Sequence, residues 1–96
     1  MQIRFLPEAE SEMIEAAVYY QRQVAGLGDL FIQEVEKAAY WIALYPHAST
    51  VVRGTVRRKV LFSFPFSLLY RAKEDIVLII AVAHHKRRPS FWQNRK

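Results

Sequence analysis

The sequence predicts an α+β domain in which a helical hairpin packs on a small, twisted, mainly antiparallel sheet, in the order β-α-α-β-β-β. Three observations support this prediction: the spacing of apolar residues, the distribution of strand-forming residues, and the length and composition of the chain. Apolar residues recur at helical spacing through the first half of the chain, and short β-branched and aromatic stretches separated by turn residues fill the second half. The chain has 96 residues and is 52% hydrophobic, which favours one folded domain over residues 1–96 and argues against intrinsic disorder.

The first predicted elements are a short strand over QIRFL and a helix that begins at Pro7. Proline is tolerated in the first turn of a helix, and the glutamates after it suit the positive end of the helix dipole. The helix is expected to continue to about Val24. Its apolar stripe consists of Ala9, Met13, Ala16, Ala17, Tyr20 and Val24.

A second helix is predicted after the segment AGLGD, whose glycines break the first helix. Asp29 is the candidate N-cap, and Pro46 ends the helix. The apolar stripe consists of Phe31, Val35, Ala38, Ile42 and Tyr45. Because GLG follows a helix rather than a strand, we interpret it as a helix break and not as a dinucleotide-binding loop.

Three strands are predicted after Pro46, and they form a meander. The segments TVRRKVLFSF, SLLYRA and IVLIIAVAH have the composition of strands, with turns expected at PF and KED. The last strand is apolar on both faces, so we expect it to be central and covered on both sides.

Charge is distributed unevenly along the chain. Residues 1–48 hold three basic and seven acidic residues, a net charge of −4, whereas residues 49–96 hold eleven basic and two acidic residues, a net charge of +9. This asymmetry predicts an anionic partner for the second half of the chain, or pairing of the domain with another chain.

A cationic cluster follows the last predicted strand. It contains His84, His85, Lys86, Arg87 and Arg88, with Arg95 a few residues further on. In a meander, cations of the first strand can lie near this strand end, so Arg53, Arg57, Arg58 and Lys59 are expected to share an edge or a face with it.

Two interpretations of this cluster remain open. Arginines bind phosphate through charge and planar donors, imidazoles titrate near neutrality, and Phe91 and Trp92 can stack on a base, which together indicate a nucleic-acid site. The alternative is a solvated basic tail. Adjacent strand residues point to opposite faces, so His84 and His85 face one substrate only if the strand has already ended.

Other candidate sites are weaker. No cofactor or metal is expected: the chain has no cysteine, and His47, the one further histidine, stands alone in the sequence. We interpret Glu8, Glu12 and Glu15 as a solvated helix face. The aromatic residues Tyr19 and Trp41 fall outside the apolar stripes, and they belong either to an exposed partner-binding patch or to a wider core.

The longest apolar run is too short for a membrane span. It extends over residues 76–83, whereas crossing a bilayer takes ~20 residues. The segment MQIRFLPEAE also lacks the basic and apolar regions of a signal peptide. We therefore expect a cytoplasmic protein.

Three segments of the chain, taken together, resemble toxins of the RelE/ParE superfamily from bacterial type II toxin–antitoxin systems. They are EAESEMIEAAVYYQRQVAGLGDLFIQEVEKA, RRKVLFSFPFSLLYR and AVAHHKRRPSFW, and the resemblance covers nearly the whole length. It implies the same β-α-α-β-β-β fold. The superfamily has two activities: RelE-like members are ribosome-dependent endoribonucleases that cut mRNA without a metal, and ParE-like members inhibit DNA gyrase.

The RelE-like activity implies a base, an acid and cations around a ribose 2′-hydroxyl and the adjacent phosphate. In this resemblance Ser67 stands where those enzymes have a basic residue, and Phe91 stands in place of a tyrosine. One of two expected lysines is retained as Arg58, and Arg87 or His85 matches the arginine at the strand end. The resemblance therefore favours the ParE-like branch.

The leading hypothesis is a ParE-like toxin that arrests growth through DNA gyrase and is neutralised by a cognate antitoxin, a small DNA-binding protein with an amphipathic segment. Its target would be bound by Arg57, Arg58, His85, Lys86, Arg87, Arg88, Trp92 and Arg95, and its antitoxin by Tyr19, Tyr20 and Trp41. The alternative is a RelE-like mRNA interferase, an enzyme that would use His84, His85, Arg57, Arg58 and Arg87. A third hypothesis is a degenerate toxin that only binds its antitoxin.

Overall fold

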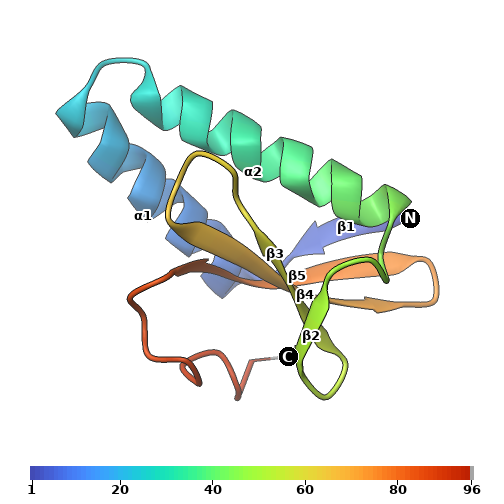
Figure 1. The fold of residues 1–96 in the computed structure, drawn as a ribbon. Helices are drawn as coiled ribbons and strands as arrows, with labels where there is room; N and C mark the ends of the chain where they lie inside the picture. Colours follow the sequence, from blue (N-terminus) through green and yellow to red (C-terminus); the bar gives the residue numbers. More distant parts are fainter. Residues whose placement is uncertain (96) are drawn as a thin grey trace.

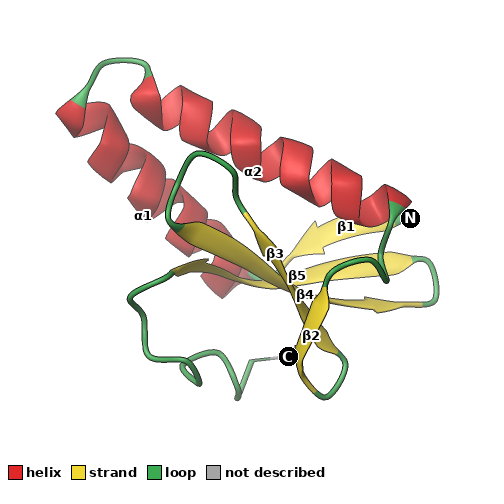
Figure 2. Ribbon diagram, in the orientation of Figure 1, coloured by secondary structure: helices red, strands yellow, loops and turns green. Residues whose placement is uncertain are grey.

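The computed structural model describes residues 1–95 as a mixed sheet with a helical hairpin on one face (Figure 1). The elements are β1 (Gln2–Phe5), α1 (Pro7–Gln23), α2 (Leu27–Leu44), β2 (Thr50–Arg53), β3 (Val56–Val60), β4 (Phe66–Lys73) and β5 (Ile76–His84). Figure 2 shows both helices on the same side of the strands. The predicted α+β class and the helical hairpin are confirmed.

The sheet has the strand order β1-β5-β4-β3-β2. The last four strands form an antiparallel meander, whereas β1 pairs with β5 in parallel, from Gln2 opposite Ile76 to Phe5 opposite Ile79. β5 therefore lies inside the sheet between β1 and β4, as its continuous apolar sequence predicts.

The sheet contains one strand more than the sequence predicts. β2 is a four-residue edge strand with every residue exposed, so it carries no alternation of buried and exposed positions that a sequence pattern can reveal. The predicted first strand of the meander is also too long, because β3 ends at Val60 and residues 61–65 form a loop. This loop is tied to α2 by the backbone N–H of Ser63, which donates to the Glu34 carboxylate at 2.8 Å.

The connection between the helices depends on Gln21 and two glycines. Gly26 has a φ of 89°, a left-handed conformation that favours glycine. The side-chain oxygen of Gln21 accepts hydrogen bonds from the backbone N–H groups of Gly26 and Gly28, both at 3.1 Å. The prediction that Asp29 is the N-cap is wrong: Gly26 holds that position and Asp29 lies in the first turn of α2, because Gln21 already binds these free N–H groups.

Gly28 sets how closely the two helices approach. A Cβ at this position would overlap the backbone oxygen of Ala17 on α1. No helix among residues 1–95 is both long enough and apolar enough to cross a membrane. The apolar faces of α1 and α2 are instead buried against the sheet and against each other.

The main core fills the space between the hairpin and the sheet. At one end it contains an aromatic cluster of Tyr20, Phe31, Phe64 and Phe66, whose ring centroids lie 4.8–6.2 Å apart. Burial among these rings raises the pKa of the Tyr20 hydroxyl, and the neighbouring Tyr19 raises it further. Tyr20 therefore belongs mainly to the core.

A second, smaller core lies on the opposite face of the sheet. It consists of Val56, Leu69, Ile80, Ala81, Ala83 and Trp92. Trp92 comes from the C-terminal segment (residues 85–95), which leaves the end of β5 and folds back under the sheet in Figure 1. This segment covers the face that the helices leave open, so β5 is buried on both sides as predicted.

Candidate functional site

A cationic groove lies on the face of the sheet opposite the helices, between the strands and the C-terminal segment. Its volume is about 350 Å³. The residues that line it are Val52, Arg53, Arg58, Ser67, Leu69, Ala83, His84, His85, Arg87, Arg88, Pro89, Ser90, Phe91, Trp92 and Gln93. Four arginines and two histidines thus surround one cavity, and none of the lining residues within residues 1–95 is acidic. Such a site attracts anions.

Strand alternation selects the cations that reach the groove. On β3, Val56 is buried in the smaller core beneath the C-terminal segment, and Arg58, two residues on, lines the groove on the same face. Arg57 and Lys59 belong to the helix face instead. Arg57 donates to the carbonyl oxygens of His47 and Ser49, at 3.2 and 2.7 Å.

The floor of the groove carries one polar group. Ser67 on β4 is 2% exposed, and it is the one buried polar residue within residues 1–95. Its hydroxyl lies 2.9 Å from Nε2 of His85, so the imidazole provides a hydrogen-bond partner that the buried hydroxyl requires. This pair joins the floor of the groove to its rim.

His84 and His85 both line the groove, because β5 ends between them. His84 is the last residue of the strand and packs edge-on against Phe66, with ring centroids 5.0 Å apart. Its Nδ1 accepts a hydrogen bond from the backbone N–H of Lys86 at 3.0 Å. The chain turns here, which releases His85 from the alternation that would point it to the other face.

Arg87 and Phe91 form one wall of the groove. The Arg87 guanidinium lies 3.9 Å from the centroid of the Phe91 ring, a cation–π distance. The same guanidinium also lies 3.6 Å from the Glu12 carboxylate. Two contacts therefore orient Arg87, although half of its side chain remains exposed.

Glu12 and Arg95 hold the C-terminal segment in place. The Glu12 carboxylate accepts two hydrogen bonds from the Arg95 guanidinium, at 2.8 and 2.9 Å, and one from the backbone N–H of Val82 at 3.0 Å. Arg95 also donates to the carbonyl of Ile80. The hydrogen bond to Glu12 is the main cause that raises the pKa of Arg95. We call this group the Glu12–Arg95 clamp.

The Glu12–Arg95 clamp supplies hydrogen-bond partners to the backbone of β5 at the edge where no strand pairs with β5. β1 ends opposite Ile79, so beyond this point β5 has no strand neighbour on that side. The side chains of Glu12 and Arg95 bind the backbone N–H of Val82 and the carbonyl of Ile80 in place of a strand. The interpretation of Glu12 as part of a solvated face is therefore wrong, since only 12% of its side chain is exposed.

The structure brings together six of the predicted site residues in the lining of the groove: Arg58, His84, His85, Arg87, Arg88 and Trp92. Lys86 is exposed beside them. Three placements differ from the prediction. Arg57 lies on the helix face, Trp92 lines the groove from a position largely buried in the smaller core, and Arg95 is held by Glu12.

Sequence reasoning missed Ser67 as a polar group of the groove, and it missed Glu12. For Ser67 a signal exists, because it is the one polar residue within PFSLLY, an otherwise apolar strand segment. The resemblance to RelE-like enzymes indicates only that Ser67 replaces a basic residue. For Glu12 no local signal exists, since its main partner lies 83 residues away.

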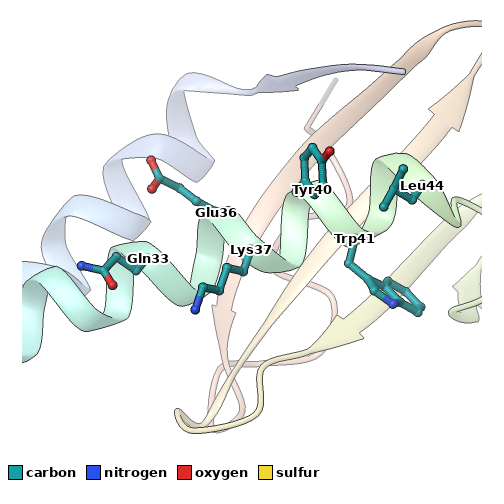
Figure 3. Close-up of a pocket in the computed structure, with 6 residues that line it drawn as sticks. All are labelled: Gln33, Glu36, Lys37, Tyr40, Trp41 and Leu44. Atoms are coloured by element: carbon teal, nitrogen blue, oxygen red, sulfur yellow. The ribbon is translucent and has the colours of Figure 1, made fainter.

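A separate apolar surface lies along the exposed side of α2. Tyr40, Trp41 and Leu44 project from the C-terminal half of this helix, with Lys37 one turn before them (Figure 3). A second hollow continues from Trp41 and Lys37 to Phe62 in the β3–β4 loop. We call the two together the α2 surface.

The three predicted antitoxin-binding residues lie in different settings. Trp41 belongs to the α2 surface, and the Lys59 ammonium lies 4.0 Å from its ring centroid. Tyr19 is 60% exposed on α1, and its ring packs edge-on against Tyr20 at 5.4 Å. Tyr20 itself is largely covered by the aromatic cluster.

Both the fold and the sequence of this chain match known proteins. The solved structure titled "Chromosomal ParDE TA system from P. aeruginosa" shares this fold, with a TM-score of 0.65 and 14% identity, over 88% of this chain and 95% of that one. Residues 3–89 match the family described as "ParE toxin of type II toxin-antitoxin system, parDE", and the chain belongs to this family. A comparison with curated protein sequences gave no match.

Proposed function

We propose that the protein arrests growth by inhibiting DNA gyrase, that the cationic groove contacts the target, and that a cognate antitoxin neutralises it in the cytoplasm. Membership of the ParE family over residues 3–89 carries this proposal. A type II toxin pairs with an antitoxin, and four arginines line the groove with no acidic residue among the described residues of its lining, although Arg87 also lies 3.6 Å from Glu12.

The composition of the groove supports gyrase inhibition over mRNA cleavage. Ser67 occupies the position that matches a basic residue of RelE-like enzymes, and its hydroxyl lies 2.9 Å from Nε2 of His85. Phe91 has no hydroxyl that could donate a proton to a leaving oxygen, and the Arg87 guanidinium packs against its ring. Loss of two catalytic groups would lower the rate of a nuclease by orders of magnitude.

Replacing two rim arginines tests this role of the groove. We expect Arg87→Ala combined with Arg88→Ala to relieve growth arrest upon induced expression, because the substitution removes two of the four arginines. The matched control is Arg22→Ala combined with Lys73→Ala, which removes the same charge from exposed positions outside the groove. Full toxicity of the groove variant at equal expression and equal stability would contradict the assignment.

The cellular response distinguishes gyrase from the ribosome. Inhibition of gyrase predicts DNA breaks and an SOS response soon after induction, together with loss of supercoiling activity when purified gyrase is mixed with the toxin. Transcripts cut within codons, in cells with intact DNA, would instead identify an mRNA interferase. Absence of any growth arrest would identify a degenerate toxin.

We also propose that an amphipathic helix of the antitoxin binds the α2 surface. Large apolar side chains there are exposed without an intramolecular partner large enough to cover them: Tyr40 is 65% exposed and Phe62 is 98% exposed. Exposed apolar surface of this kind is typical of helix-in-groove recognition. The α2 surface lies on the helix side of the sheet, and the cationic groove lies on the opposite side. An antitoxin helix bound to the α2 surface therefore leaves the groove open. To screen the arginines of the groove, an acidic or mixed tail of the antitoxin would have to extend around the sheet.

Substitution of the exposed residues tests this surface without disturbing the core. We expect Tyr40→Ala combined with Phe62→Ala to keep toxicity but to weaken neutralisation by the antitoxin about tenfold or more, as loss of two large interface residues does. The control is Tyr19→Ala on α1. If that variant escapes neutralisation and the α2 variant does not, the antitoxin binds α1 instead.

A further inference from the structure

The cationic groove has the dimensions and chemistry of a small-ligand site as well as those of a charged surface. Its volume of about 350 Å³ lies at the small end of the range for ligand pockets, ~300–1,000 Å³. It also reaches below the surface, because Ser67, Leu69 and Ala83 on its floor are all less than a tenth exposed. A flat protein–protein contact requires no such depth.

The lining is divided into a charged rim and a partly apolar interior. Arg53, Arg58 and Arg88 are exposed on the rim, from three different segments of the chain. Leu69 and Ala83 supply apolar floor beneath them. A ligand that fits this division carries a negative charge at one end and a flat, largely apolar body at the other.

Arg87 is prepared for such a ligand. Its guanidinium already contacts the Phe91 ring at 3.9 Å and lies 3.6 Å from the Glu12 carboxylate, so it is partly oriented before a ligand binds. A guanidinium plane stacks on nucleic-acid bases as aromatic rings do. Since Trp92 is buried, Arg87 is the better placed of the two to contact a base.

Hydrogen-bonding groups complete the lining. Ser67 and His85 present a hydroxyl and an imidazole that already contact each other, and Ser90 and Gln93 add further donors and acceptors on exposed positions. Base edges are recognised by such mixed groups. An inorganic anion would leave most of these groups unused.

We propose that the cationic groove binds one nucleotide unit without cleaving it, with the phosphate at the rim arginines and the base against Arg87 and the apolar floor. The unit is either a free nucleotide or one unpaired nucleotide of a single strand, because both present the same chemistry to the groove. This goes beyond gyrase inhibition, since it concerns a ligand that the toxin binds alone.

Binding is measured with the full-length chain in the absence of gyrase, so its outcome does not depend on the proposed target. Cell-free synthesis supplies the chain and avoids arrest of a producing cell. The probes are AMP and dTMP, followed by NMR titration, and fluorescein-labelled 12-nucleotide single strands of DNA and RNA, followed by anisotropy. The matched DNA duplex and a polyglutamate competitor complete the set.

The decisive variant is Arg58→Ala combined with Arg88→Ala, and its charge-matched control is Arg22→Ala combined with Lys73→Ala. We expect the groove variant to bind its nucleotide probe about a hundredfold more weakly, since each lost arginine contact weakens binding about tenfold. The control should stay within about threefold. The slope of log affinity against log salt for a single strand should fall by ~1.4, because each neutralised phosphate contributes ~0.7.

A second variant, Arg87→Lys, keeps the charge and removes the guanidinium plane. We expect it to bind AMP several-fold more weakly and inorganic phosphate equally well. Tight binding of AMP identifies a free nucleotide as the source, and binding of the 12-nucleotide strand alone identifies a single strand.

Four results would overturn the proposal. For either source, these are the absence of binding to every nucleotide probe and equal losses in the groove variant and its control. Where the strand alone binds, they are tighter binding of the duplex than of the single strand and displacement of the strand by polyglutamate at equal charge concentration. Thermal melts of each variant ensure that any loss of binding is not a loss of fold.

Discussion

The Glu12–Arg95 clamp gives the sharpest prediction for stability. Glu12→Ala would leave the Arg95 guanidinium, 15% exposed, without its counter-ion, and the backbone N–H of Val82 without its acceptor. Both groups lie in the partly buried space between α1, β5 and the C-terminal segment, where water cannot fully replace the carboxylate.

The expected cost is about 3 kcal/mol. Removing one partner of a buried ion pair costs ~3–5 kcal/mol, and the residual exposure of both side chains places this pair at the lower end. A domain of 96 residues has a total stability of ~5–14 kcal/mol, so the loss is a large fraction of it. Since 1 kcal/mol shifts Tm by ~4–8 °C at this size, Tm should fall by ~12–24 °C.

Urea unfolding of four chains measures this effect: wild type, Glu12→Ala, Arg95→Ala and the double variant. The double variant should be more stable than the sum of the single losses predicts, by at least ~1 kcal/mol, because it no longer contains an uncompensated charge. The control Glu15→Ala removes an exposed carboxylate of the same helix and should change stability by less than ~0.5 kcal/mol. A Glu12→Ala loss below ~1 kcal/mol, or strictly additive losses, would refute the reasoning.

Three further predictions concern the helical hairpin and its surroundings. Gly28→Ala should destabilise the fold by ~1–3 kcal/mol in urea unfolding, because its Cβ overlaps the Ala17 backbone oxygen; an unchanged midpoint would contradict this. Stability should decline at alkaline pH, because the Tyr20 pKa is raised: its contribution is complete below pH 10.0, the pKa of a free tyrosine, and is lost as the pH rises through the folded pKa. Tyr20→Phe should flatten this decline, and equal slopes for both chains would contradict it. Arg57→Ala should speed hydrogen exchange in the α2–β2 connection, whose carbonyls it binds, and leave exchange in β5 unchanged.

The helices were predictable because their stripes follow the 3.6-residue period over more than four turns. β5 was predictable because it is apolar throughout. β2 was not, since Val51 and Val52 are both exposed and no alternation marks the strand. Its position depends instead on tertiary contacts, among them the hydrogen bonds that Arg57 donates to the preceding connection.

The cations of the groove could be predicted from the sequence, but the burial of the residues around them could not. Period-two alternation from buried Val56 places Arg58 on the groove face and Arg57 on the other, but the sequence does not reveal that Val56 is buried there. Trp92 looks like an exposed aromatic because it follows a cationic stretch without any periodicity. It is instead buried in the smaller core, and the Glu12–Arg95 clamp that holds the same segment is a contact beyond any local pattern.

The clamp also has a consequence for the order of folding. Glu12 and Arg95 are 83 residues apart, and the hydrogen bond from Val82 to Glu12 spans 70 residues. The free energy of such long-range contacts offsets the entropy cost of closing the loop only after most of the chain has folded. The C-terminal segment, which forms one wall of the groove, is therefore placed at a late stage of folding. Before that stage the arginines of the groove are exposed but do not yet line a common cavity.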